Sequence, residues 1–270
     1  MAGRMRRANA RFAGKRIDAE LESLARNDRM ADSTKHDFGF CPVLQQMITE
    51  QKWVDDDGST YPAFGVSTNN NLAVIRSLMM AVGPARTMEI GLSMGGSALT
   101  FAQSHKDLGH APQGQHTAID PWQKPLLHSI GLKAMERAGL SPYLEFDERT
   151  SDLCLPAFLE AGRGFQMIYI DGSHAFEDVF LDCHYCYHLL EPGGLLLFDD
   201  CSDPNIAKVL TFVRRNMAYG LTEFDLTAHR PDKGRSVRYR GAKILGLTQL
   251  AGFQKSGSGR RPLNYKTRRF

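Results

Sequence analysis

The sequence predicts an α/β protein with a doubly wound, mostly parallel seven-stranded sheet whose last strand is antiparallel. Two observations support this prediction. From about residue 72 onward, apolar runs of strand length alternate with helical patterns, which is typical of a parallel sheet covered by helices on both faces. The last two apolar runs have no helical pattern between them, so they are expected to close the sheet as an antiparallel pair.

The expected elements follow one another with Gly, Pro or Asp at their boundaries. The parallel strands are expected over 87–91, 116–120, 143–148, 165–171 and 195–200. The helices that follow them are expected over 95–105, 124–138, 153–162, 176–190 and 205–217. The closing strands are expected over 221–226 and 236–249. The domain organisation is expected to be a basic tail and helical lid, a main domain and a basic C-terminal tail, over 1–60, 61–253 and 254–270.

The composition is typical of a soluble globular protein. Apolar residues make up 42% of the chain and charged residues 23%. No apolar stretch approaches the roughly 20 residues that span a bilayer, and the N-terminus has no apolar signal-peptide core. Five cysteines without framework spacing favour a reducing compartment, so we expect a cytoplasmic protein without a membrane span.

The positive charge is concentrated at the two ends of the chain. Residues 1–16 and 254–270 each carry six Lys or Arg and no acid, although the net charge of the whole chain is only +3. The simplest interpretation is a pair of solvated tails. Nucleic-acid binding by these tails stays open as an alternative, and the first run also resembles an Arg-rich transit peptide.

Carboxylates end two of the expected strands. Asp171 ends the run IYID, and Asp199 and Asp200 end the run LLLFDD 28 residues further on. Ligands of open α/β sheets bind just outside the carboxyl ends of the strands. Three carboxylates there are costly without a positive charge among them, and hard oxygen ligands suit Mg²⁺ or a similar cation. The spacing therefore predicts a metal-assisted active site.

The segment EIGLSMGGS, over 89–97, has the glycines of a cofactor-binding loop. Its spacing differs from the dinucleotide pattern G-x-G-x-x-G, and no phosphate-binding Lys follows it. Glu89 precedes the loop and suits a cationic ligand, and Asp120 ends the next strand, where a carboxylate can bind ribose hydroxyls. These acids favour S-adenosylmethionine over NAD. An alternative is that the glycines serve only the packing of helix on strand.

Two further motifs have competing interpretations. Ser93 stands in a literal G-x-S-x-G, which would make it a hydrolase nucleophile with His229 as base and Asp199 or Asp200 as acid. Cys183 and Cys186 form a C-x-x-C with histidines nearby. Their spacing on one helix favours burial against the sheet over a zinc site.

The chain resembles the class I S-adenosylmethionine-dependent methyltransferases with a Rossmann-like sheet. More specifically, it is similar to the metal-dependent O-methyltransferases that act on catechol, caffeoyl-CoA and macrolide sugars. The resemblance spans about 85–201 and is carried by the segments TMEIGLSMGGSALTFA, AIDPWQ, IYIDGSHAFEDVFLDC and LLEPGGLLLFDD. The combination of D-G-S-H with a later pair of acids is its most specific part.

The resemblance implies a set of contacts to S-adenosylmethionine and to the metal. The implied cofactor-binding residues are Glu89, Gly91, Gly95, Ser97, Asp120, Ser151 and Asp152, with Ser67, Thr68 and Trp122 as weaker candidates. The implied metal ligands are Asp171, Asp199 and Asp200. In catechol-type enzymes Asn matches Asp200, so this site would carry one more negative charge.

The resemblance also implies a catalytic base. His174 matches a position where catechol-type enzymes have Lys, and its imidazole suits proton removal near neutral pH; local capping or packing is the alternative. The expected function is Mg²⁺-assisted O-methylation of a small polar acceptor. A nucleic-acid-modifying enzyme and a protein that shares the module without methyl transfer stay open, and a homo-oligomer is compatible with the sequence.

Overall fold

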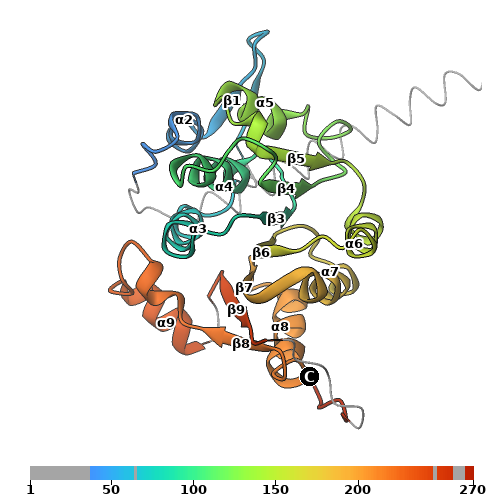
Figure 1. The fold of residues 1–270 in the computed structure, drawn as a ribbon. Helices are drawn as coiled ribbons and strands as arrows, with labels where there is room; N and C mark the ends of the chain where they lie inside the picture. The colour runs from blue at the N-terminus through green and yellow to red at the C-terminus, as the bar shows by residue number, and fades with distance from the viewer. Residues whose placement is uncertain (1–36, 64–65, 246–247, 258–264) are drawn as a thin grey trace, which may run out of the picture.

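The computed structural model describes residues 37–63, 66–245, 248–257 and 265–270, and a seven-stranded sheet forms its centre (Figure 1). The strand order is β5-β4-β3-β6-β7-β9-β8. The strands are β3 (Thr87–Ile90), β4 (His116–Ile119), β5 (Leu144–Asp147), β6 (Phe165–Ile170), β7 (Leu190–Phe198), β8 (Leu221–Phe224) and β9 (Ala251–Lys255).

The sheet has the predicted mixture of parallel and antiparallel pairs. Strands β3 to β7 are parallel to one another, and β9 pairs antiparallel with both β7 and β8. From β3 the chain first moves to β4 and β5 and then returns to β6 on the other side of β3. The strand order thus reverses between β3 and β6, which is where open α/β sheets place their ligands. The predicted fold class is confirmed.

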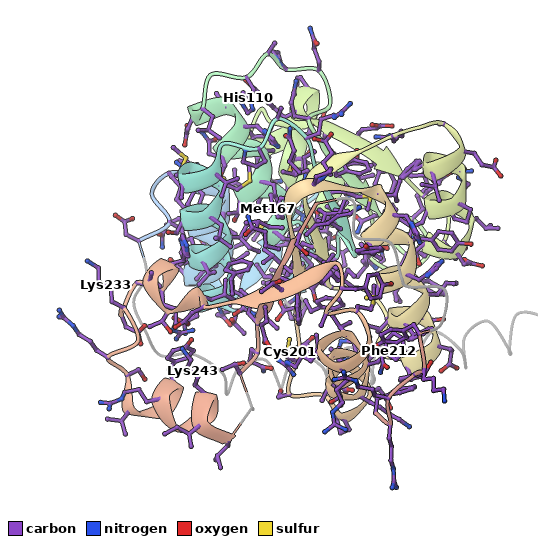
Figure 2. All side chains as sticks on the ribbon, turned by 60° about the horizontal axis from the view of Figure 1, so that its bottom comes forward. His110, Met167, Cys201, Phe212, Lys233 and Lys243 are labelled. Carbon is purple, nitrogen blue, oxygen red and sulfur yellow. The ribbon has the colours of Figure 1, made fainter. Side chains whose placement is uncertain are left out.

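Helices cover both faces of the sheet (Figure 1). One face carries α3 (Asn69–Val82), α4 (Gly96–Asp107) and α5 (Ile130–Arg137), and the other carries α6 (Ser151–Glu160), α7 (Phe176–Leu189) and α8 (Pro204–Asn216). Alternate residues of β6 separate the two layers. Met167 and Tyr169 pack with α3 and α4, whereas Ile168 and Ile170 pack with α6, α7 and α8. Figure 2 shows Met167 within the densely packed interior.

The expected strand over 236–249 is wrong. Residues Val237–Leu245 form the helix α9, and the last strand is β9, closer to the C-terminus. The alternation V-R-Y-R resembles a strand, but Ser236 accepts a hydrogen bond from the backbone N–H of Tyr239 at 3.3 Å, which caps the helix start. Strand β9 instead uses an apolar stretch whose Ala251 and Phe253 are buried. A 3₁₀ helix, η2 (Leu226–His229), precedes α9.

The expected helix over 124–138 is shorter than predicted. Turns occupy 121–129, and the regular helix α5 begins only at Ile130. His128 and Ser129 have left-handed φ angles of 51° and 57°, which a helix does not admit. A 3₁₀ helix, η1 (Ser141–Tyr143), follows α5.

The described N-terminal part packs on α4 and α5. It consists of α2 (Pro42–Glu50) and a hairpin of β1 (Lys52–Val54) and β2 (Thr60–Pro62). Trp53 is buried beneath Arg137, whose guanidinium carbon lies 3.8 Å from the ring centre. Lys133 Nζ donates a hydrogen bond to Asp55 Oδ2 at 2.5 Å. The predicted lid role remains a prediction, and the basic run over 1–16 lies outside the described residues.

The described C-terminal residues, 265–270, contact α8 although residues 266–270 are exposed. Asn216 accepts a hydrogen bond from the Arg268 backbone N–H at 2.6 Å and donates to the Arg268 carbonyl at 3.1 Å. The rings of Phe270 and Phe212 meet edge to face at 4.9 Å. None of the helices in the described ranges has the length and apolar character needed to cross a membrane.

Candidate active site

The three predicted metal ligands lie together at the carboxyl edge of the sheet. Asp171 directly follows β6, and Asp199 and Asp200 directly follow β7. These strands are parallel neighbours, and their last residues, Ile170 and Phe198, pair in register. The aspartates therefore reach one place from two adjacent strands.

A small pocket at this edge also includes the predicted base His174. Its lining residues are Ile170, Asp171, Gly172, Ser173, His174, Val179, Phe198, Asp199, Asp200 and Ile206. Among these lining residues there are three carboxylates and neither a Lys nor an Arg. The pocket is therefore strongly acidic, which suits a cation. We call Asp171, Asp199, Asp200 and His174 the acid cluster.

Asp199 is nearly completely buried and accepts hydrogen bonds from two other elements. The side chain of Asn71, in the first turn of α3, donates to Oδ1 at 2.5 Å. The Tyr169 hydroxyl, from β6, donates to Oδ2. The backbone N–H of Asp200 adds a bond to Oδ1 at 2.7 Å. These donors are neutral, so they orient the carboxylate without cancelling its charge.

Ser67 connects Asp171 to the same network. Its hydroxyl donates to Asp171 Oδ2 at 2.9 Å and lies 3.2 Å from the Tyr169 hydroxyl. Burial, followed by the charges of Asp199 and Asp200, raises the pKa of Asp171 well above its usual value. This direction is the response expected of carboxylates that lack a cation among them.

His174 lies against the third aspartate of the cluster. Its Nε2 is 3.1 Å from Asp200 Oδ2, and its Nδ1 is 3.7 Å from Asp203 Oδ2. The bond to Asp200 is the main cause that raises the pKa of His174, while partial burial opposes it. The ring is about half exposed, so it can meet both solvent and an acceptor.

The donor set of the acid cluster fits a divalent cation, but the oxygens do not yet converge on one point. Within the described ranges, no three His, Cys, Asp or Glu side chains are arranged as a finished metal site. Each aspartate instead bonds a protein group: Ser67, Tyr169 or His174. Hard oxygen ligands at an acidic strand edge still suit Mg²⁺, so the metal role stays a prediction.

The loop between β3 and α4 is closely packed against protein backbone. Gly91 has a φ of +94°, and a Cβ atom there would lie 2.1 Å from the Asp171 carbonyl oxygen. Gly95 has a φ of +87° and lies against the backbone of Gly131. Both positions need glycine for the fold itself. The packing alternative therefore explains these glycines without reference to a ligand.

Asp120 anchors this loop. Its Oδ2 accepts hydrogen bonds from the backbone N–H groups of Leu92 and Ser93 and from Gln123, at 3.2, 2.8 and 3.0 Å. Its Oδ1 accepts from the Trp122 N–H at 2.7 Å. The carboxylate thus holds the loop in place, and its predicted contact with a ribose stays a prediction.

Glu89 and Ser97 lie at the two ends of the loop, and both are buried. Ser97 is in the first turn of α4, where free backbone N–H groups favour an anion. Neither carboxylate oxygen of Glu89 has a hydrogen-bond partner. His116 Nε2 lies 3.1 Å from Glu89 Oε1, but the contact lacks hydrogen-bond geometry.

Ser151 and Asp152 begin α6, just beyond β5. Burial raises the pKa of Asp182, on α7, to about 6, and a hydrogen bond from the Ser151 side chain partly offsets this. Trp122 is 57% exposed, so its ring is open to a partner. Thr68 caps α3 by accepting a hydrogen bond from the Asn71 N–H. The cofactor roles of these residues stay predictions.

The two competing motifs are explained by other contacts. His229 Nδ1 lies 3.1 Å from the Ser77 hydroxyl, and no hydrogen bond among the described residues joins His229 to Ser93. The set required for a serine hydrolase is therefore not assembled. Cys183 and Cys186 are buried in the core, as expected for packing rather than for zinc.

Sequence reasoning missed the polar partners of the acids. Tyr169 and Asn71 hold Asp199, and His116 faces Glu89. Tyr169 could have been found, because it precedes Asp171 by two residues and so shares its face of the strand. Nothing in the sequence connects Asn71 with a residue 128 positions away.

The known proteins that this chain resembles are methyltransferases. Residues 88–201 match a family model described as a methyltransferase domain. Caffeoyl-CoA O-methyltransferase 2 of Petunia hybrida is 29% identical over 127 residues, which cover 46% of this chain and 48% of that protein. Caffeoyl-CoA O-methyltransferase 1 of Nicotiana tabacum is also 29% identical over 127 residues, covering 46% and 49%. The chain spans about half the length of these curated relatives.

A solved structure shares the fold. Cofactor-bound Rv0187 from MTB superposes with a TM-score of 0.55 at 17% sequence identity, covering 87% of this chain and 98% of that chain. The region matched by the family model begins in β3 and ends just after Asp200. It therefore contains both the glycine loop and the acid cluster.

Proposed function

We propose that the protein is a class I S-adenosylmethionine-dependent methyltransferase that methylates a hydroxyl oxygen of a small polar acceptor, since residues 88–201 match a family model described as a methyltransferase domain. The observation that supports this most is the contact between the glycine loop and the acid cluster. Gly91 lies directly against the Asp171 backbone, so a donor bound at the loop would be next to an acceptor bound at the acids. Such proximity is the main source of rate for an already activated donor.

On the donor side, the loop and its neighbours would bind the cofactor. Glu89 supplies a buried carboxylate with unpaired oxygens, which suits a cationic group. Gly91, Gly95 and Ser97 would bring backbone close to the ligand, while Asp120 holds the loop. Ser151 and Asp152 would contact the adenine side. When bound, S-adenosylmethionine would supply an activated methyl group.

On the acceptor side, the acid cluster would bind and deprotonate the hydroxyl. Asp171, Asp199 and Asp200 would hold a divalent cation such as Mg²⁺, which would lower the pKa of the acceptor hydroxyl. His174 would take the hydroxyl proton on Nδ1, because its Nε2 faces Asp200, as the oxygen attacks the methyl carbon. Asp200 keeps the ring in place and stabilises the imidazolium that results.

Calorimetry tests the proposal. S-adenosylmethionine is titrated into the wild-type protein with and without Mg²⁺, and the same titrations are made with Asp199→Asn. We expect the wild type to bind the cofactor, and we expect Mg²⁺ to bind the wild type but not Asp199→Asn. Glu177→Gln is the matched control, because Glu177 is an exposed acid on α7 outside the pocket.

The two halves of the proposal can fail separately. If the wild type does not bind S-adenosylmethionine, methyl transfer by this protein is refuted. If it binds the cofactor but Mg²⁺ produces no binding heat, the metal-assisted mechanism is refuted while methyl transfer stands.

A further inference from the structure

A continuous chain of polar side chains runs from the molecular surface to the buried carboxylate of Glu89. It connects α4, β3 and β4 on one face of the sheet. The members, in order from the surface, are His110, His105, Thr87 and His116, and we call them the imidazole chain. Figure 2 shows His110 toward the periphery of the molecule, well away from Met167 in the interior.

Each link of the imidazole chain is at hydrogen-bond distance. His110 Nδ1 lies 2.8 Å from His105 Nδ1, and His105 Nε2 lies 2.9 Å from Thr87 Oγ1. Thr87 Oγ1 lies 2.9 Å from His116 Nδ1. His116 Nε2 lies 3.1 Å from Glu89 Oε1, an ion-pair distance without hydrogen-bond geometry, so this last contact is electrostatic.

The inner members are shielded from water. Thr87, Glu89, His105 and His116 are each 0% exposed, whereas His110 is only partly buried. Phe101 stacks on the His116 ring at 4.6 Å and 14°, which fixes the orientation of that ring. The imidazole chain therefore provides a hydrogen-bonded route between the surface at His110 and the buried ring of His116.

The cost of burying the Glu89 carboxylate favours an added proton at the inner end of the imidazole chain. A buried carboxylate without a compensating positive charge is very unfavourable. Glu89 has His116 as its neighbour, so one proton added to this pair would cancel the charge of the buried carboxylate. This proton is no longer needed once a cationic ligand faces Glu89, because the ligand then supplies the positive charge.

The surrounding charged groups do not replace that proton. Arg76 of α3 is paired with Asp107 and bonds Ser104 at the outer side of α4. From β6, Tyr169 stays a neutral phenol, because burial raises its pKa well above 10. Asp171 supplies no positive charge, and the carboxylate of Glu89 is itself one of the causes that raise the pKa of Asp171.

The imidazole chain can pass a proton without leaving a charge in the interior. Burial lowers the pKa of His105 to about 3, so its ring is neutral and has one donor and one acceptor nitrogen. The threonine hydroxyl likewise donates one bond and accepts another. The hydrogen bonds of the imidazole chain can therefore all donate toward the surface, or all donate toward the interior.

We propose that the imidazole chain neutralises Glu89 with one proton and releases that proton at His110 when a cationic ligand binds beside Glu89. The inference rests on the proposed function, since the ligand is S-adenosylmethionine. On release, the Nδ1 proton of His116 passes to Thr87 Oγ1, and the hydroxyl's own proton passes to His105 Nε2. The Nδ1 proton of His105 passes to His110 Nδ1, and the Nε2 proton of His110 leaves to water. His116, Thr87 and both outer histidines end neutral.

The test counts protons during ligand binding. S-adenosylmethionine is titrated into the full chain in phosphate and in Tris at the same pH, because the two buffers absorb protons with different heats. We expect the wild type to release about one proton per bound ligand. We expect Glu89→Gln to lose this release, because its amide needs no proton. Thr117→Val, which removes a buried hydroxyl on the neighbouring position of β4, should keep it.

A second pair of variants tests the route. Thr87→Val keeps the size of the side chain but removes the hydroxyl, whereas Thr87→Ser keeps the hydroxyl. In stopped-flow mixing with a pH indicator, Thr87→Ser should release its proton together with ligand binding. Thr87→Val should lose the coupled release, which a purely structural role of Thr87 would leave intact.

The outcomes separate this inference from the proposed function. Binding of S-adenosylmethionine by the wild type without proton release overturns the relay and leaves methyl transfer standing. Equal release by Glu89→Gln and the wild type also overturns it. Failure of the wild type to bind S-adenosylmethionine refutes the proposed function and the relay with it.

Discussion

Gly91 faces the backbone carbonyl of Asp171 so closely that a Cβ atom at Gly91 would lie 2.1 Å from the carbonyl oxygen. This contact joins the end of β3 to the end of β6, at the point where the strand order reverses. It brings the loop of the proposed donor site and the first acid of the proposed acceptor site into direct contact. The two half-sites are therefore one structural unit.

Substitution of Gly91 should disturb that unit. Gly91→Ala combines a left-handed φ with a backbone clash, so we expect a loss of about 3 kcal/mol or more in the free energy of unfolding. Gly139→Ala is the matched control, because Gly139 has a φ of +65° but open space around its α-carbon. It should lose about 1–2 kcal/mol. Urea unfolding measures both, and equal losses would contradict the close contact.

Removal of the Tyr169 hydroxyl should weaken the support of Asp199. Tyr169→Phe removes one donor to a buried carboxylate, so we expect a loss of about 1–3 kcal/mol in the free energy of unfolding. Thermal and urea unfolding at neutral pH provide the measurement. Tyr143→Phe, in η1 and away from the acid cluster, should have a smaller effect. A stability of Tyr169→Phe equal to that of the wild type would show that the hydroxyl does not hold Asp199.

The raised pKa of His174 predicts how methyl transfer should depend on pH. A base must be neutral to accept a proton, so activity should fall as the pH decreases through a value above 6.5. His174→Ala should reduce kcat by about 10²–10⁴-fold and remove this inflection. His184→Ala, an exposed histidine on α7, should retain the wild-type profile. An unchanged pH profile in His174→Ala would refute its role as base.

Asp182 should make the protein less stable as the pH rises through the acidic range. Its pKa is about 6 in the folded protein, against 3.8 for the ordinary group, so the folded state binds the extra proton between these values. The free energy of unfolding should therefore fall between about pH 4 and pH 6, by about 2–3 kcal/mol, and remain at the lower level above pH 6.

Asp182→Asn isolates this contribution. The free energy of unfolding of this variant should not show the fall between pH 4 and pH 6 that we predict for the wild type. Glu177→Gln, an exposed acid on the same helix, should retain that fall. If Asp182→Asn and the wild type showed the same pH dependence, burial of an acidic proton at this position would be excluded.

The sequence allows the sheet and the position of the acids to be predicted. Parallel strands end at one edge, so Asp171 and Asp199 had to be close once both were assigned to strand ends. The alternation of apolar residues could not distinguish β9 from α9, because the V-R-Y-R segment satisfies a strand pattern but is capped by Ser236. The hydrogen bond that caps the start of α9 therefore decided the structure of this segment, and the strand-like alternation of its residues did not.

The polar partners of the acids depend on packing between distant segments. Asn71 reaches Asp199 across 128 positions and Ser67 reaches Asp171 across 104, because α3 lies on the same face of the sheet as Tyr169. No local pattern contains this information. The sequence left packing open as a role for the loop glycines but did not identify their partners, since the backbone that they contact directly follows β6 or belongs to α5.

The most direct test of the central claim is a crystal structure with Mn²⁺ and S-adenosylhomocysteine, using the anomalous signal of manganese. The account predicts a manganese peak among the carboxylates of Asp171, Asp199 and Asp200, with the cofactor product beside Glu89 and the glycine loop. A cofactor product bound at the loop with no manganese at the three aspartates, or manganese bound elsewhere, would contradict it.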